Sequence, residues 1–562
     1  MKTNGLLGLL ALVVLFGCAE EPQQQALGLD DGIYIEGEEA APQAQGKADG
    51  AGAYSKAFDA LPAGINEDAP LIALFAPDDP VITLELEQTD KVIAARKADP
   101  RDYAEGENPY RVRYAVYDLK NELIVEKLIE AQNAGVDVQI LIESTMLASS
   151  KRYHKSDERL VEAGFELATD HKKLSGDAYK TVDLVGIRRT GYMHLKLRLF
   201  ETPERDWLLT GSFNPGDHAP FNDETLHLIN DPTLVRRYQA MYDGVLREEL
   251  VDNPWDESAA VNVLFTPEAS GVRAGAKLLE WLQQENEQIL LMVFALRDIT
   301  APGFDQGLID LLYFKAKAGV PVYVITDKKQ TYYDSGATDI LRNGGVHVYE
   351  VTNTSTRYTA MHHKVAILGR EHIRVITDTA NWSKGALGSV DTPASYHESV
   401  LFIDTERLDQ GYTGRRYLSQ FVRVLERYAF YGEQDRQPSA RSAIAELSGH
   451  GDWPTQATRF VGWDIYTTVG QEAFVTGELE VLGAWGANNL GLPMSTDAST
   501  YPTWRSSSVE LPLGVPFDWK LTSGDPRSTD LTWEPRTNRT DRALAPAFSE
   551  DDVAEIHGSW GR

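Results

Sequence analysis

Apolar, strand-like runs alternate with amphipathic helical segments over most of the chain, and their order occurs twice. Each copy has a strand pattern, a helical pattern and a second strand pattern, at 114–119, 123–131 and 136–142 in the first copy and at 290–296, 308–316 and 320–325 in the second. Apolar strands separated by amphipathic helices are typical of sheets covered by helices. The pattern therefore predicts two α/β halves of like topology, at 67–252 and 253–432.

Short similar segments flank these patterns and support a duplication. Leu-Phe-Ala-Pro at 74–77 recurs as Leu-Phe-Thr-Pro at 264–267. An Arg-Arg-Tyr helix start occurs at 236–238 and again at 415–417. The two halves are therefore expected to follow one another in the chain as copies of one unit.

The pattern changes after residue 432. Residues 433–456 are polar and contain several prolines and glycines, which predicts a linker. From 457 to 545 the strand patterns are short and glycine turns are frequent, which predicts an all-β sandwich, with 546–562 as a tail. This segment holds five tryptophans, more than so small a core needs, so we expect some to be exposed for a flat ligand: Trp463, Trp485, Trp504, Trp519 and Trp533.

The first 18 residues have the layout of an export signal. Lys2 precedes an apolar stretch from Leu6 to Phe16 that is too short for a membrane span, and Cys18 follows as the only cysteine. The place of Cys18 resembles a bacterial lipoprotein cleavage site, which implies a lipid anchor; the alternative is a signal with an incidental thiol. Residues 19–66 are expected to form a flexible linker because they contain few large apolar side chains.

Length and charge narrow the classes of function. A chain of 562 residues is too long for one core and suggests three or four domain-sized units. The formal net charge of -30 argues against broad binding of nucleic acid or anionic membrane, because such binding depends on Lys and Arg displacing counterions. A local basic cleft remains open as an alternative.

Two histidine motifs stand at corresponding places in the two copies. Each consists of an H-x-K pair followed by a Ser or Thr and an Asn: His194, Lys196, Ser212 and Asn214 in the first copy, and His362, Lys364, Thr379 and Asn381 in the second. On a strand, residues two apart share a face, so each His would project beside its Lys. A single H-x-K occurs often by chance, but two copies with matching partners indicate a site.

Facing copies of this motif would place two imidazoles, two ammonium groups and two amides in one pocket, which suits a phosphodiester. One imidazole can attack phosphorus while the other transfers protons, and the Lys and Asn side chains can hold the phosphate oxygens. Neither a metal nor another cofactor is expected. Each histidine needs a partner on its other ring nitrogen. Glu224 and Glu398, at similar places after the asparagines, are the candidates, and solvated glutamates are the alternative.

These residues resemble the phospholipase D superfamily, whose members carry two copies of H-x-K-x4-D followed by G-[SG]-x-N. The resemblance spans residues 71–431 and implies two α/β halves with the active site at their pseudo-twofold interface. His194 and His362 match the family's histidines, and the lysines and asparagines match its other positions. Ser212 and Thr379 match its downstream hydroxyl positions, which implies that they support phosphate binding. The resemblance implies that His194 is the nucleophile and His362 the general acid and base.

The chain departs from the family pattern at the aspartate. Glu201 stands there in the first copy and Gly369 in the second. That aspartate is expected to support the site rather than to react, and Asp206 or Glu371 could substitute for it from the neighbouring turns. A catalytically inactive relative is the alternative. His363 should point away from His362, and we interpret it as structural.

The C-terminal segment 457–545 resembles the starch-binding domain, the family 20 carbohydrate-binding module, through Leu-Gly-Ala-Trp at 482–485, Phe-Asp-Trp-Lys at 517–520 and Trp-Glu at 533–534. Four residues match the first glucan site of that family: Trp485, Lys520, Trp533 and Asn538. Trp504 matches a second site, where Val469 replaces a common tyrosine. Indole faces stack on glucose rings. A sandwich with buried indoles and no affinity for sugar is the alternative.

Together these features predict an exported, lipid-anchored phosphodiesterase in the cell envelope, at the outer membrane or cell surface. It would hydrolyse or transfer a phosphatidyl group through a phosphohistidine, and bind a starch- or glycogen-like α-glucan. The fold class expected is a duplicated phospholipase D-like α/β sandwich plus an all-β, immunoglobulin-like carbohydrate-binding sandwich. The alternatives are an inactive surface glycan-binding protein and a nuclease of the phospholipase D type.

Overall fold

The computed structural model describes most of the chain beyond the first 54 residues. The described residues are 55–61, 68–104, 106–147, 156–174, 182–331, 336–351, 360–429, 438–449, 452–486, 490–528, 531–547 and 551–561. The predicted signal, Cys18 and most of the predicted linker lie outside these ranges. Residues 55–61, assigned to that linker, pack on the first half, where Ala57 is buried and its carbonyl accepts from the backbone N–H of Ile82.

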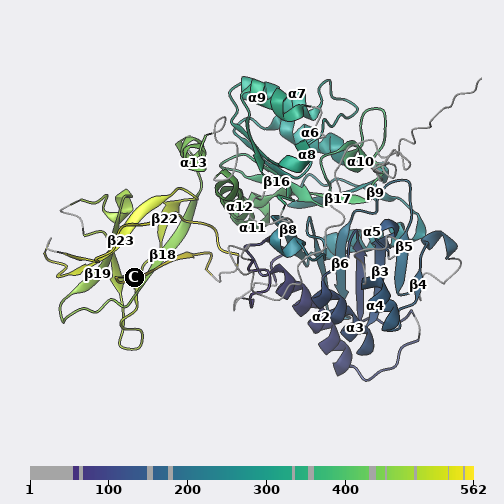
Figure 1. Cartoon of the computed structure of the whole chain (residues 1–562), viewed down its shortest axis with the longest axis horizontal. Coiled ribbons are helices and arrows are strands. Elements are labelled where there is room, and N and C mark those ends of the chain that lie inside the picture. Colours follow the sequence, from purple (N-terminus) through teal and green to yellow (C-terminus); the bar gives the residue numbers. More distant parts are fainter. Residues whose placement is uncertain are drawn as a thin grey trace, which may run out of the picture.

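The first half is a mixed sheet covered by helices (Figure 1). Its strand order is β1-β8-β7-β6-β2-β3-β5-β4. The strands are β1 (Leu71–Ala76), β2 (Arg111–Val116), β3 (Asp137–Glu143), β4 (Leu167–Ala168), β5 (Leu184–Ile187), β6 (Lys196–Glu201), β7 (Asp206–Gly211) and β8 (Glu224–Ile229). The helices are α2 (Val81–Ala98), α3 (Glu122–Asn133), α4 (Ser156–Glu162) and α5 (Pro232–Arg247).

The second half has a sheet of order β10-β17-β16-β15-β12-β13-β14. Its strands are β10 (Val261–Thr266), β12 (Ile289–Val293), β13 (Val322–Asp327), β14 (His347–Val351), β15 (Lys364–Leu368), β16 (Arg374–Asp378) and β17 (Glu398–Asp404). Its helices are α6 (Ala274–Gln284), α7 (Leu308–Lys317), α8 (Lys328–Thr331), α9 (Ala337–Gly344), α10 (Lys384–Leu387), α11 (Thr405–Asp409) and α12 (Tyr412–Ala429). β9 (Val251–Asn253) and β11 (Glu268–Gly271) form a small parallel pair at the junction of the halves.

The two strand orders match position by position, which confirms the predicted duplication. β1 corresponds to β10, β8 to β17, β7 to β16, β6 to β15 and β2 to β12. Local sequence starts two helices of the first half. The Asn121 side chain caps α3 by accepting from the N–H groups of Leu123 and Ile124, and Asp231 followed by Pro232 starts α5. The halves are therefore built alike around the histidine motifs, except that β4 of the first half has no counterpart in the second.

Helices α5 and α12 lie between the two sheets and join the halves. One hydrophobic cluster holds residues of both sheets together with Tyr238 and Met241 of α5 and Tyr417 and Phe421 of α12. Separate clusters fill the outer faces, beneath α2 and α3 in the first half and beneath α6, α7 and α9 in the second. The result is a layered α/β body whose central layer fixes the orientation of one half against the other (Figure 1).

The C-terminal domain is a curled β structure of order β22-β18-β21-β20-β19-β23-β24, with β25 beside β23 and β26 beside β18. Its strands are β18 (Thr455–Trp463), β19 (Glu472–Gly477), β20 (Leu492–Ser495), β21 (Trp504–Ser506), β22 (Val509–Pro512), β23 (Phe517–Gly524), β24 (Thr532–Trp533), β25 (Arg539–Asp541) and β26 (Ala554–Ser559). It docks on α12, where Leu513 and Ala545 enter the central cluster and the Ser419 hydroxyl accepts from the N–H of Ala545 at 3.0 Å.

Two segments are more regular than the sequence predicts. The predicted linker contains helix α13 (Ala440–Gly449), whose Ile444 and Leu447 are buried against the central cluster. Residues 554–559, within the predicted tail, add β26 in parallel to β18. Across the ranges that the structure describes, we find no helix with the length and apolar character needed to span a membrane.

Candidate active site

The interface between the halves brings the two histidine motifs together. Each histidine follows a bridge to the other half: Met193 pairs with His397, and Met361 pairs with Asp223. The N–H of His194 donates to the carbonyl of His397, and the N–H of His362 to that of Asp223, each at 3.0 Å. The backbone of each histidine is therefore held by the opposite half.

The glutamates cross the same interface. Nδ1 of His194 lies 2.7 Å from Oε1 of Glu398, and Nδ1 of His362 lies 2.8 Å from Oε2 of Glu224. Both glutamates are buried and begin equivalent strands, β17 and β8. The two candidate partners thus contact the histidines, but each one orients the imidazole of the other half.

Both lysines of the motif are buried next to their histidines. Nζ of Lys196 donates to the carbonyl of His194 at 2.7 Å, and Nζ of Lys364 to that of His362 at 2.7 Å. Burial lowers the pKa of Lys196 to about 8 and that of Lys364 to about 7, while Glu224 and Glu398 oppose this change. Two positive charges therefore meet at the site at neutral pH or just below.

One contact makes the two histidines unequal. Nζ of Lys196 lies 3.0 Å from Nε2 of His194. An ammonium group only donates, so this nitrogen accepts, and the proton of a neutral His194 ring is then on Nδ1, directed at Glu398. Burial and the lysine charges also hold the pKa of His194 well below its usual range. His194 is thus a neutral imidazole with a lone pair on Nε2.

The pKa of His362 is lowered less than that of His194. Burial lowers the pKa of His362, but the Glu224 carboxylate at its Nδ1 acts in the opposite direction. Its side chain is 12 % exposed. This environment suits a group that takes up and releases a proton on Nε2.

The hydroxyl residues of the motif form hydrogen bonds with β8 and β17, the strands that begin at Glu224 and Glu398. Oγ of Ser212 donates to Oε2 of Glu224 at 2.6 Å and accepts from the N–H of Thr225 at 2.8 Å. In the second half, Oγ1 of Thr379 accepts from the N–H of Ser399 at 2.8 Å. These side chains position Glu224 and Glu398.

Asn214 lies just beyond the end of β7, and Asn381 lies just beyond the end of β16. The amide oxygens of Asn214 and Asn381 are buried, and neither has a hydrogen-bond partner within the described part of the chain. A buried amide without an internal partner is costly. The unpartnered atom of each amide is an acceptor, so a phosphate oxygen would be held by the NH2 group of the same side chain and not by this oxygen.

Two aromatic residues that the sequence analysis missed form matched walls beside the histidines. The Tyr117 ring meets that of His194 edge to face at 5.1 Å, and Phe294 meets His362 at 4.5 Å. The ammonium groups lie near the same rings, with Lys196 5.8 Å from Tyr117 and Lys364 5.0 Å from Phe294. Both aromatics directly follow equivalent strands, β2 and β12, so aligning the two repeats residue by residue would have found them.

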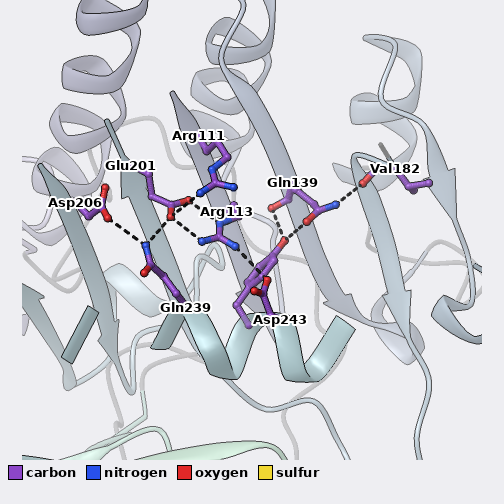
Figure 2. Close-up of polar contacts among 9 residues, drawn as sticks. Arg111, Arg113, Gln139, Val182, Glu201, Asp206, Gln239 and Asp243 are labelled. Carbon is purple, nitrogen blue, oxygen red and sulfur yellow. Dashed lines mark hydrogen bonds and ion pairs between the residues drawn. The ribbon is translucent and has the colours of Figure 1, made fainter. Parts of the chain in front are cut away.

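Glu201, at the family's aspartate position, belongs to an ion-pair cluster at the opposite end of β6 from Lys196 (Figure 2). Its carboxylate accepts from Nε and from an Nη atom of Arg113, each at 2.6 Å, and from Gln239 of α5 at 2.7 Å. Asp206 accepts from the same Gln239 at 3.1 Å. Both carboxylates therefore connect β6 and β7 to α5.

Gly369 occupies the corresponding end of β15. Its φ of +85° suits glycine, and its carbonyl accepts from Nε2 of Gln288 at 2.8 Å. Glu371 lines a separate cavity with Arg370 and Trp453. Neither Asp206 nor Glu371 thus reaches the histidines, and the departures from the family pattern lie outside the candidate active site.

His363 points to the opposite side of its strand from His362. Its Nδ1 lies 2.8 Å from Oγ1 of Thr225, and its Nε2 lies 3.3 Å from the side-chain amide of Gln420 on α12. Burial lowers the pKa of His363 to about 3. It is a neutral core residue that ties β15 to α12.

The C-terminal domain presents two of its tryptophans together. Trp485 and Trp533 are 36 % and 46 % exposed, and their rings lie 6.2 Å apart with 32° between the planes. Lys520 is half-buried on β23, where its Nζ donates to the carbonyl of Glu534 at 3.5 Å, and Asn538 is exposed between β24 and β25. The two tryptophans thus form an exposed pair, and the parts of Lys520 and Asn538 in a glucan site stay a prediction.

Trp504, expected at a second glucan site, is instead a core residue. It is 6 % exposed, and its Nε1 donates to the carbonyl of Ile465 at 3.0 Å. The reason is its place on β21, whose alternate side chains face the interior. Val469 is fully exposed on the loop before β19. The second site, as the sequence predicts it, is absent from the described residues.

Truncating either member of the exposed pair should weaken glucan binding. Trp485→Ala or Trp533→Ala is expected to weaken binding to soluble starch roughly tenfold or more, because a stacking indole in the centre of a site carries much of the affinity. Isothermal titration with the whole protein measures this. Trp463→Ala is the matched control, since that indole is 42 % exposed but stacks on His557 elsewhere in the domain. Equal losses in all three variants would contradict the assignment.

Comparison with known proteins agrees with this architecture. The family model described as "Cardiolipin synthase, PLD-like domain" matches residues 107–246 and 278–415, and the starch binding domain model matches 457–545. An alpha-amylase of Streptomyces violaceus is 37% identical over 84 residues, which are 15% of this chain and 14% of that protein. An alpha-amylase of Thermomonospora curvata is 40% identical over 72 residues, 13% of this chain and 12% of its own.

Solved structures resemble parts of the chain. Nuc, a phospholipase D family member from Salmonella typhimurium, has 20% identity and a TM-score of 0.23, covering 31% of this chain and 95% of its own. The family 20 module of a maltotetraose-forming amylase from Pseudomonas saccharophila has 28% identity and a TM-score of 0.15, covering 18% and 98%. By the family models, the chain carries two phospholipase D-like domains, one in each α/β half, followed by a family 20 starch-binding domain.

Proposed function

We propose that the protein is a phosphodiesterase of the phospholipase D type that works through a phosphohistidine. The observation that carries this proposal is the pair of crossed contacts, in which each half supplies the glutamate for the histidine of the other. Two oriented imidazoles, each with a buried lysine that donates to the backbone of its histidine, would form a site for a single phosphodiester. An inactive glycan-binding protein would have no need of this arrangement.

The first step uses the inequality of the two histidines. Nε2 of His194 attacks phosphorus and forms the P–N bond, while the P–O bond to the leaving alcohol breaks. His362, protonated on Nε2, gives its proton to that alcohol oxygen. The proton on Nδ1 of His194 stays directed at Glu398. Burial raises the pKa of this carboxyl to about 8, and the positive phosphohistidine ring beside it favours the ionised carboxylate.

The second step reverses these roles at phosphorus. His362 takes a proton from water as its oxygen attacks, the P–N bond breaks, and His194 leaves as the neutral imidazole. An alcohol in place of water would give transfer of the phosphoryl group instead of hydrolysis. Lys196, Lys364 and the amides of Asn214 and Asn381 would hold the phosphate oxygens and stabilise the charge of the transition state.

The pKa values of the lysines predict the alkaline limit of activity. As pH rises through about 7 for Lys364 and about 8 for Lys196, each ammonium loses its proton, and the phosphate loses that positive partner. We therefore expect kcat/KM to fall through this window, which a pH series on a soluble phosphodiester measures. Lys364→Arg should lack the first part of the fall, because a guanidinium stays charged. A profile that stays level to pH 9.5 would contradict the assignment.

A phosphatidyl group is the substrate class we propose, on the basis of the family models. The net charge of -30 favours this over a nuclease. We further propose that the chain is exported and tethered through a lipid on Cys18, and that the starch-binding domain holds it near an α-glucan. Anchor and module would both place the catalyst near its substrate.

The test is a panel of substrates. Protein from Ala19 onward is incubated with a chelator and with phosphatidylcholine, phosphatidylglycerol, a p-nitrophenyl phosphodiester or single-stranded DNA, and released products are measured. Headgroup release from either lipid is expected. Turnover of DNA alone would favour the nuclease, and no turnover of any substrate with retained starch binding would favour the inactive glycan-binding protein.

A further inference from the structure

Asp378 is a buried carboxyl that the proposed reaction does not use. It ends β16, directly before Thr379, and its counterpart in the first half is Gly211, directly before Ser212. Both residues have positive φ, 145° for Gly211 and 116° for Asp378. Glycine adopts this backbone at little cost, whereas a side chain there is strained by roughly 1–3 kcal/mol. An aspartate is therefore an unfavourable choice for the backbone alone.

The Asp378 side chain reaches across the interface into the first half. Oδ1 accepts from Oγ1 of Thr210 at 2.9 Å, and Oδ2 accepts from the hydroxyl of Tyr238 on α5 at 2.5 Å. Nδ1 of His227 lies 4.0 Å from Oδ1. The residue is fully buried. Hydrogen bonds from the neutral hydroxyls of Thr210, Tyr238 and Ser399 hold the carboxyl in one place.

This carboxyl makes the site asymmetric. Gly211 has no side chain, and an added Cβ would lie 2.2 Å from the carbonyl oxygen of Thr225. At this position the second half thus supplies a carboxylate that reaches into the first half, and Gly211 offers no counterpart to it. Burial and the charge of Arg198 lower the pKa of Lys196. Glu398 and Glu224 raise it first, and Asp378 raises it after them. Lys196 is also the lysine for which a contact with Nε2 of its histidine is found among the described residues.

We propose that Asp378 is a positioning residue that keeps Lys196 protonated and thereby keeps His194, and not His362, in the form that attacks phosphorus. This inference rests on the proposed function and deepens it by naming what breaks the symmetry of the site. Without the carboxylate, Lys196 loses part of the interaction that offsets its burial. A neutral Lys196 has a lone pair of its own, so its amine would no longer be restricted to donating to Nε2 of His194.

The surroundings of Asp378 fix the direction of the effect. Burial raises the pKa of Asp378 to about 6, and Lys196 and the neighbouring hydroxyls oppose this. Asp378 is therefore charged above about pH 6, and Lys196 stays charged up to about pH 8. Titratable or hydroxyl groups that face the carboxyl come from every element around it: Thr210, Tyr238, His227, Ser399, Glu398, Tyr417 and Lys196.

The test measures the charge of Lys196 directly. Whole protein labelled with ¹³C and ¹⁵N at the lysine side chains is titrated by NMR, and Lys196→Arg assigns the signal. Asp378→Asn and Asp378→Gly are each expected to lower the pKa of Lys196 by about 0.5–1 unit and that of Lys364 by less. Asp378→Gly also relieves the strained backbone. Tyr238→Phe, which removes one hydrogen bond and keeps the charge, should have a smaller effect.

An unchanged pKa of Lys196 in both Asp378 variants overturns the proposal and leaves the carboxyl as a clamp between the halves. If the pKa shifts, the alkaline limb of kcat/KM should move to lower pH by the same amount in those variants. A lowered pKa of Lys196 without the matching shift in the alkaline fall of kcat/KM also overturns the proposal. Failure of the proposed function would appear separately, as a lack of turnover by the unmodified protein.

Discussion

Replacing either candidate histidine with alanine is expected to lower phosphodiester turnover at least roughly 1,000-fold, but for different reasons. His194→Ala removes the atom that bonds to phosphorus, so no covalent intermediate can form. His362→Ala leaves that atom in place and removes the proton donor. The two variants should therefore differ in what accumulates.

A p-nitrophenyl phosphodiester separates these roles, because its leaving group departs without a proton. With this substrate, His362→Ala should still release one equivalent of p-nitrophenol and hold the phosphoryl group on His194. His194→Ala should release none. Intact-mass measurement after acid-free quenching shows the modified protein, and the burst of p-nitrophenol counts the sites.

His363→Gln is the matched control, because His363 adjoins His362 but contacts Thr225 and Gln420 on the other side of the strand. Its turnover per folded molecule should change by only a few-fold. A phosphoryl group found on His362 instead of His194 would reverse the assignment. Ordinary turnover by either alanine variant would remove the two-histidine mechanism.

The sequence predicted the main parts of the site because both copies carry the same short motif. Because the two H-x-K pairs lie on duplicated strands, the sequence predicts that His194 and His362 meet at the interface of the two halves. The positions of Glu224 and Glu398 in the sequence made them candidates. The sequence did not predict that each would contact the histidine of the other half. A contact between Glu224 and His362 depends on how two halves pack, and short motifs describe one half at a time.

The errors concern residues whose environment depends on distant elements. Trp504 matched a sugar-binding position, but the register of β21 turns it into the core. Helix α13 was predicted as linker, since its apolar side chains are few and find their partners in the central cluster. Tyr117 and Phe294 belong to no motif. They can be recognised only because they occupy equivalent positions in the two repeats.

Glu201→Ala should show that the altered aspartate position supports the fold and not the reaction. Arg113 is 7 % exposed and depends on Glu201 for its two short contacts, so the variant leaves a buried guanidinium without its main partner. We expect the free energy of unfolding to fall by about 3–5 kcal/mol. Denaturant unfolding followed by tryptophan fluorescence measures this, and kcat per folded molecule should stay within a few-fold.

Asp243→Asn provides the comparison for this loss, because Asp243 faces the same arginine at 3.4 Å from a side chain that is 45% exposed. Solvent screening should limit its effect to less than about 1 kcal/mol. Replacing both buried partners, as in Arg113→Met with Glu201→Leu, should recover much of the stability, since no unpaired charge remains. A Glu201→Ala protein that keeps its stability but loses turnover would contradict this prediction. The ion pair in Figure 2 would then support catalysis at Lys196, which lies at the other end of β6.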